Sequence, residues 1–131
     1  HIVKEGSDVT IVSFGKMMLR VNEAVAALEA EGMSVEVIDL RTVRPIDHET
    51  IVNSVKKTNR LVIVEEAWPL ASISSEITYQ VQKHAFDYLD APIRRICSQD
   101  VPLPYASTLV EAYLPSVSKI VEAAKSVAYK A

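Results

Sequence analysis

The chain has 131 residues, with 14 Lys plus Arg against 17 Asp plus Glu and a formal net charge of -3. This length suits one domain with one core, and a content of 49% hydrophobic and 24% charged residues is typical of a folded globular protein. The apolar runs are far shorter than the roughly 20 residues of a membrane-spanning helix. The sequence contains no cluster of Lys and Arg residues of the kind that binds nucleic acid. Its single cysteine cannot form an internal disulfide. We expect one domain over residues 1–131, with neither membrane nor nucleic acid as a partner.

The expected elements alternate between strands and helices. In chain order they are a hairpin of strands 2–4 and 9–14, a helix from Met17 to Gly32, a strand over 34–40, a helix from Asp47, a strand over 61–64, a helix from Ile73 to Ala85, a strand over 93–97, an extended loop over 101–105 and a helix opened near Pro115. Residues 61–64 are apolar on both faces, which is typical of an interior parallel strand. The alternation predicts an α/β fold, a mostly parallel sheet with helices on both faces.

Two helices carry the clearest local signals. The first has an apolar stripe at helical spacing, made of Met17, Val21, Ala24, Val25 and Leu28. The second begins at Asp47, whose carboxylate can accept hydrogen bonds from the free N–H groups of the first turn. Its predicted buried residues are Ile51, Val52 and Val55.

Glycine occurs only at positions 6, 15 and 32, so the chain contains neither a dinucleotide-binding G-x-G-x-x-G motif nor a phosphate loop. Glu65 and Glu66 end the most apolar strand, where a buried carboxylate with a raised pKa could act as an acid or base. The simpler interpretation follows from strand geometry, because consecutive residues point to opposite faces. One glutamate would then be solvated, and the other would be hydrogen-bonded or would face a partner.

Other candidate sites are weaker still. His84 and Asp87 lie three residues apart on a helix and could share a metal, but two ligands make a poor site and solvated side chains explain them as well. Cys97 has no activating neighbour in the sequence, so we expect a buried structural thiol rather than a nucleophile. Ser72, Ser74 and Ser75 could bind an anion at a helix start, although a helix cap is the simpler expectation.

Aromatic residues beside acidic ones indicate an interaction surface. The candidate partner-binding residues are Trp68, Phe86, Asp87, Tyr88 and Asp90. The alternative is that the rings merely cover an edge of the sheet. Enzyme and interaction domain therefore both remain open on these residues alone.

Five segments together resemble the carboxy-terminal domain of the beta subunit of the pyruvate dehydrogenase decarboxylase component, a member of the transketolase carboxy-terminal domain class. The segments are residues 8–13, 35–47, 64–69, 85–92 and 100–106. The resemblance implies a three-layer α/β/α sandwich whose five-stranded sheet is mostly parallel with one antiparallel strand. The equivalent domain of a branched-chain 2-oxo acid dehydrogenase or a transketolase, and an independent α/β ligand-binding module, are the alternatives.

The resemblance also implies a role in assembly. In the complete enzyme, thiamine diphosphate and magnesium would lie between the alpha subunit and another beta domain, so this domain would bind no cofactor and would be inactive alone. Its expected partners are the alpha subunit and a second beta subunit in a heterotetramer, and the peripheral subunit-binding domain of dihydrolipoyl acetyltransferase. Basic residues of that binding domain would meet Asp90. The implied location is the bacterial cytoplasm or the mitochondrial matrix.

The chain departs from these relatives at several turns. Ala67, residues 71–75 and Ser98 stand where relatives commonly have glycine. Because Ala and Ser adopt positive φ less readily than Gly, we expect these turns to differ in shape.

Overall fold

The computed structural model describes residues 1–41, 44–99 and 114–129. Its strands are Ile2–Lys4 (β1), Val9–Ser13 (β2), Val35–Asp39 (β3), Leu61–Val64 (β4) and Arg94–Ile96 (β5). Its helices are Met17–Ala30 (α1), His48–Thr58 (α2), Ile73–Ala85 (α3), the short 3-10 helix Phe86–Tyr88 (η1) and Val117–Val127 (α5). The loop predicted over 101–105 lies outside the described residues.

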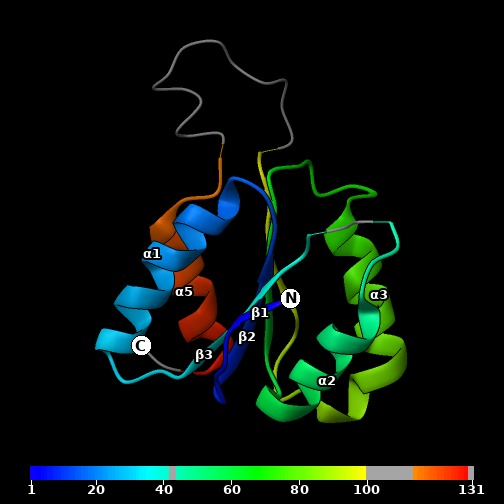
Figure 1. Ribbon diagram of the computed structural model, residues 1–131, viewed down its shortest axis with the longest axis horizontal. Helices are drawn as coiled ribbons and strands as arrows, with labels where there is room; N and C mark the ends of the chain where they lie inside the picture. The colour runs from blue at the N-terminus through cyan, green and yellow to red at the C-terminus, as the bar shows by residue number, and fades with distance from the viewer. Residues whose placement is uncertain (42–43, 100–113, 130–131) are drawn as a thin grey trace.

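The described strands form one sheet in the order β1-β3-β2-β4-β5. The pairings among β3, β2, β4 and β5 are parallel, and β1 pairs antiparallel with β3. Helices α1 and α5 cover one face, and α2 and α3 cover the other (Figure 1). The predicted three-layer sandwich, with five strands of which one is antiparallel, is therefore confirmed.

The predicted hairpin is wrong, because β1 pairs with β3 and not with β2. The four residues between β1 and β2 cross the start of β3, so that β2 runs antiparallel to β1 with β3 between them. There the Asp8 backbone N–H donates to the Ser34 carbonyl at 2.8 Å, and the Ser34 N–H donates to the Asp8 carboxylate at 2.7 Å. At Gly6 the crossing is so close that a Cβ would lie 2.2 Å from the carbonyl carbon of Val35. Gly6 serves this close approach rather than a tight turn.

Strand β4 divides the core between the two faces of the sheet. Val62 and Val64 pack with α1 and α5, while Leu61 and Ile63 pack with α2 and α3. All four side chains are fully buried, which confirms the interior strand expected from its apolar composition. The two layers of helices therefore share one central element.

The helical predictions agree closely with the structure. The buried residues of α1 are the predicted five, Met17, Val21, Ala24, Val25 and Leu28. Asp47 caps α2, since its carboxylate accepts from the Thr50 N–H at 3.1 Å, and this hydrogen-bonding lowers the pKa of Asp47. Helix α5 is capped by Ser116, one residue after the predicted Pro115.

Candidate functional site

Glu65 and Glu66, at the carboxyl end of β4, differ sharply in environment. Glu65 is fully buried, and its carboxylate accepts from the Ser74 hydroxyl at 2.7 Å and from the Ser74 N–H at 3.4 Å. Glu66 is exposed. The simpler interpretation, one solvated and one hydrogen-bonded glutamate, is therefore confirmed. In this structure Glu65 holds the first turn of α3, and its contacts do not present an acid or base to a ligand.

The hydroxyls of Ser72 and Ser75, at the start of α3, bond the preceding loop rather than the N–H groups of the helix. Ser72 occupies the cap position, but its hydroxyl donates to the Pro69 carbonyl at 3.2 Å and makes no cap hydrogen bond. Ser75 donates to the same carbonyl at 3.1 Å, and Arg95 reaches it at 2.9 Å. The predicted hydroxyl cap is wrong because the Glu65 carboxylate, from the end of a strand, takes the cap's place.

Cys97 lies at the edge of this cluster and is half-buried. Its sulfur is 3.7 Å from the Ser74 hydroxyl and 3.8 Å from the Glu65 carboxylate. Burial raises the pKa of the Cys97 thiol above its usual range, and the neighbouring Glu65 acts in the same direction. A thiol with a raised pKa is a poor nucleophile, as expected for Cys97, although the burial expected for this side chain is only partial.

Among Ala67, residues 71–75 and Ser98, where relatives commonly have glycine, one residue has a glycine-like backbone conformation. Ala71 adopts a φ of 53°, in the left-handed region that favours glycine. Ala67 and Ser98 have no such φ, and the Ser98 N–H donates to the Ala67 carbonyl at 3.0 Å. The alanine therefore keeps a glycine-like backbone shape at one position of the loop.

The histidines form no metal centre among the described residues, where no group of three or more His, Cys, Asp or Glu side chains could hold an ion. His84 nevertheless lies close to His48, because both line a hollow of about 380 Å³ together with Lys56. Sequence reasoning missed this proximity, since His48 and His84 belong to different helices.

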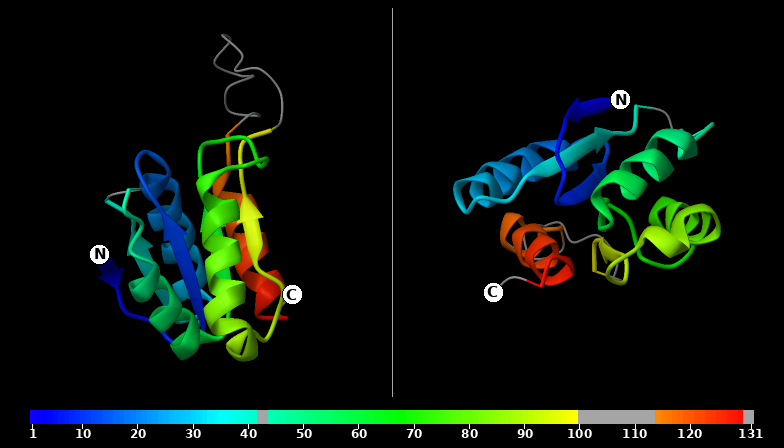
Figure 2. Two further views of the ribbon diagram at one scale, coloured as in Figure 1. Left: turned by 90° about the vertical axis from the view of Figure 1, so that its right-hand side faces the viewer. Right: turned by 90° about the horizontal axis from the view of Figure 1, so that it is seen from below.

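The candidate partner-binding residues occupy opposite ends of the molecule. Phe86, Asp87 and Tyr88 form η1, just past the end of α3, and the exposed fractions of Phe86 and Tyr88 are 64% and 45%. Trp68, 49% exposed, precedes the start of α3. Because α3 has 13 residues, or about 20 Å of helix, the structure does not bring Trp68 together with η1 (Figures 1 and 2).

Asp90 follows η1 and is held by groups that the sequence did not indicate. Its N–H donates to the Asn59 carbonyl at 2.9 Å, and its carbonyl accepts from the Tyr129 hydroxyl at 3.0 Å. Its carboxylate lies 3.7 Å from the Arg60 guanidinium. A hollow of about 480 Å³ adjoins Asp90 and is lined in part by Phe86 and Leu89 of the same segment. The η1 end therefore combines an exposed carboxylate, aromatic rings and a hollow.

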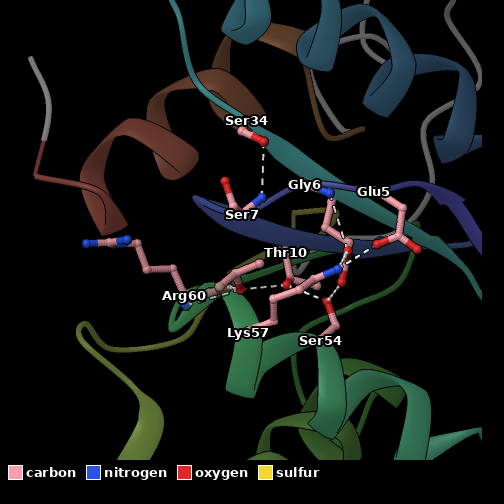
Figure 3. Close-up of polar contacts among 10 residues, drawn as sticks. Glu5, Gly6, Ser7, Thr10, Ser34, Ser54, Lys57 and Arg60 are labelled. Carbon is pink, nitrogen blue, oxygen red and sulfur yellow. Dashed lines mark hydrogen bonds and ion pairs between the residues drawn. The ribbon is translucent and has the colours of Figure 1, made fainter.

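A second polar cluster links the β1–β2 crossing segment to α2 (Figure 3). Its centre is Glu36 of β3, which is fully buried and bonds the Ser54 hydroxyl and the Lys57 ammonium. Lys57 also pairs with Glu5 at 2.6 Å, and Gly6 N–H donates to Glu36 at 3.3 Å. The ion pairs raise the pKa of Lys57, and the hydrogen bond from Lys57 is the main cause of a lowered pKa at Glu5. The cluster was not predicted, because the three acidic and basic residues lie on separate elements.

Family models, curated proteins and solved structures that resemble this chain point to the same domain family. The family model described as the transketolase C-terminal domain matches residues 1–120. The chain belongs to this family. Among solved structures, a chain of a split-gene transketolase described as an inactive beta4 tetramer superposes on this domain with a TM-score of 0.85 at 29% identity. The match covers 98% of this chain and 41% of that one.

Two curated relatives of this transketolase-type domain are beta subunits of the pyruvate dehydrogenase E1 component. The mitochondrial subunit of Dictyostelium discoideum is 56% identical over 126 residues, which is 96% of this chain and 35% of that protein. The subunit of Rhizobium meliloti is 53% identical over 130 residues, which is 99% of this chain and 28% of that protein. The chain thus spans about a third of the length of the relatives it matches. No helix among the described residues is long and apolar enough to cross a membrane.

Proposed function

We propose that residues 1–131 are one domain of a longer pyruvate dehydrogenase beta subunit, and that this domain serves assembly and partner docking rather than catalysis. The observation that carries the proposal is the identity of 53–56% to two such subunits over nearly the whole chain. The complete enzyme would decarboxylate pyruvate oxidatively and transfer the acetyl group to a lipoyl group. A transketolase role has weaker support, since the structural match to that enzyme is only 29% identical.

The complete enzyme would use thiamine diphosphate and magnesium, and the domain's own residues give no reason to place either group here. Within the ranges 1–41, 44–99 and 114–129, no cluster of potential ligands could hold a metal. The serines at the start of α3 are engaged with Pro69 and Glu65.

The proposed partners are the alpha subunit, a second beta subunit and the peripheral subunit-binding domain of the acetyltransferase. The last would dock at Asp90, beside Asp87, Phe86 and Tyr88, where exposed rings and carboxylates suit a basic partner. Trp68, at the other end of α3, would serve a separate subunit contact. The two relatives include a mitochondrial and a bacterial protein, so the mitochondrial matrix or the bacterial cytoplasm is the proposed location.

The docking proposal can be tested with the beta subunit assembled with its alpha subunit. Asp90→Lys should weaken binding of the peripheral subunit-binding domain, and the loss should be larger at low salt than at high salt. Glu66→Lys is the matched control, since it makes the same charge change at the opposite end of β4. Calorimetric titration measures both. Equal affinities for wild type and Asp90→Lys at both salts would remove Asp90 from the interface.

A further inference from the structure

Arg60, the residue beside the proposed docking aspartate, is fixed by groups other than that aspartate. Its Nε donates to the Val127 carbonyl at 3.1 Å, and one terminal nitrogen donates to the Asp8 carbonyl at 3.2 Å. These acceptors lie at the end of α5 and in the segment that crosses β3. Figure 3 shows the Arg60 side chain extended away from Thr10 and from the polar cluster. The guanidinium is therefore a positive charge whose place does not depend on Asp90.

Asp90 is likewise positioned without Arg60. Its backbone N–H and carbonyl are bonded to Asn59 and Tyr129, as described above. The distance of 3.7 Å between the Arg60 nitrogen and the Asp90 carboxylate is too long for a good hydrogen bond, and 55% of the Asp90 side chain is exposed. What Arg60 adds at Asp90 is therefore mainly charge.

We propose that Arg60 is a specificity-determining residue that weakens the docking of a basic partner at Asp90. A cation that approaches the Asp90 carboxylate also approaches the guanidinium, and the like charges repel. Because Arg60 is only 25% exposed and held by two carbonyls, it cannot simply swing away. Arg60 thus lowers the affinity for any basic surface and selects partners with further contacts, for which the rings of η1 are available. The inference rests on the proposed docking function.

The test uses the beta subunit assembled with its alpha subunit, with the peripheral subunit-binding domain as probe, titrated at about 50 mM and about 300 mM NaCl. Arg60→Gln should tighten binding about two- to fivefold at the lower salt, the range expected for a partly exposed charge pair. The gain should shrink at the higher salt. Arg60→Lys, which keeps the charge, should bind like wild type. Arg41→Gln is the charge-matched control, because Arg41 follows β3 at the other end of the sheet.

A double variant separates this inference from the docking proposal. Because the guanidinium repels the partner's cation directly, Arg60→Gln should still tighten binding at the lower salt when Asp90 is already asparagine. Loss of affinity in Asp90→Asn, with no gain in Arg60→Gln, would overturn the role of Arg60 and leave the docking proposal standing. Weaker binding by both Arg60→Gln and Arg60→Lys would likewise overturn it, because the residue would then act as a support for the surface. No loss in Asp90→Asn would overturn the docking proposal itself.

Discussion

Glu36 and Glu65 are both fully buried, but the molecule compensates their burial in different ways. Glu36 faces an ammonium group, Lys57, and a hydroxyl, Ser54. The Glu65 carboxylate contacts the hydroxyl and N–H of Ser74 and the thiol of Cys97. A buried carboxylate requires compensating partners, and these can be either a full charge or the dipoles at a helix start.

The two glutamates serve different structural tasks. The Glu36 cluster ties the segment between β1 and β2 to α2, across distances of 18 to 52 residues in the chain. In the Glu65 cluster, Ser74 is only nine positions from Glu65, whereas Cys97 is 32 positions away. The ion pairs of the Glu36 cluster join the segment before β2 to α2, and the hydrogen bonds between Glu65 and Ser74 join the end of β4 to the start of α3.

Removal of the Lys57 ammonium should have the largest effect on the stability of the fold. Lys57→Met leaves the buried Glu36 carboxylate without its positive partner, so we expect it to destabilise the fold more than substitutions at Glu65 or Cys97 do. Chemical denaturation measures the loss of stability. Lys56→Met is the control, because Lys56 lies at the surface 5.4 Å from the centre of the Tyr88 ring. Adding Glu36→Gln to Lys57→Met should restore part of the loss. A double variant no more stable than Lys57→Met would contradict this account of the cluster.

Loss of the dipole-compensated carboxylate should have a smaller effect. Glu65→Ala leaves the Ser74 hydroxyl and N–H without their acceptor, which costs about 1–3 kcal/mol of unfolding free energy. Glu65→Gln keeps one acceptor oxygen and should cost less than Glu65→Ala. Glu66→Ala, at the exposed neighbour, should change stability by no more than about 0.5 kcal/mol. Equal losses at positions 65 and 66 would show that burial does not distinguish the two glutamates.

The stability that Lys57 and Glu5 contribute should also depend on pH. The pKa of Glu5 is lowered from its ordinary value of 4.5, so its contribution is present above that value and is lost as the pH falls through the folded-state value. The pKa of Lys57 is raised from 10.5, so its contribution is present below that value and is lost as the pH rises through the folded-state value. The denaturation midpoint of the wild type should therefore exceed that of Lys57→Met by the largest amount at pH values between the pKa of Glu5 and the pKa of Lys57. A difference independent of pH would refute the ion-pair explanation.

The smallest effect concerns Cys97 in the Glu65 cluster. Because burial raises the pKa of Cys97, the folded chain should contain less thiolate than the unfolded chain near pH 8. Alkylation by iodoacetamide near pH 8 should therefore be slower in the native chain than in the same chain in denaturant. Raising the pH should narrow this difference. An equal rate in both states would show that the fold does not protect the thiol.

Local patterns in the sequence predicted most of the fold. The five apolar residues of α1 recur at helical spacing, and Asp47 precedes a helix as a typical cap, so nothing beyond neighbouring residues was needed. The hairpin failed for the opposite reason. The sequence shows two β-rich runs and a short connection, but the pairing of β1 with β3 depends on a close crossing at Gly6 that only the assembled sheet reveals.

The same limit applies to the site. The difference in burial between Glu65 and Glu66 was predicted from the alternation of side chains along a strand. The aromatic residues of η1, which are exposed, were singled out because they lie beside acidic residues in the sequence. The contact between Arg60 and Asp90 did not follow, because it joins the turn after α2 to the segment after η1. No local spacing links these two positions.

The bonds around Asp90 also have a consequence for the order of folding. The Arg60 side chain bonds a carbonyl 67 residues later, and the Tyr129 hydroxyl bonds a carbonyl 39 residues earlier. Contacts so distant along the chain form late, because closing long loops costs entropy before the contacts repay it. During synthesis from the amino end, this surface is complete only after α5 has been made and packed. A partner that recognises the finished surface would thereby recognise a fully folded domain.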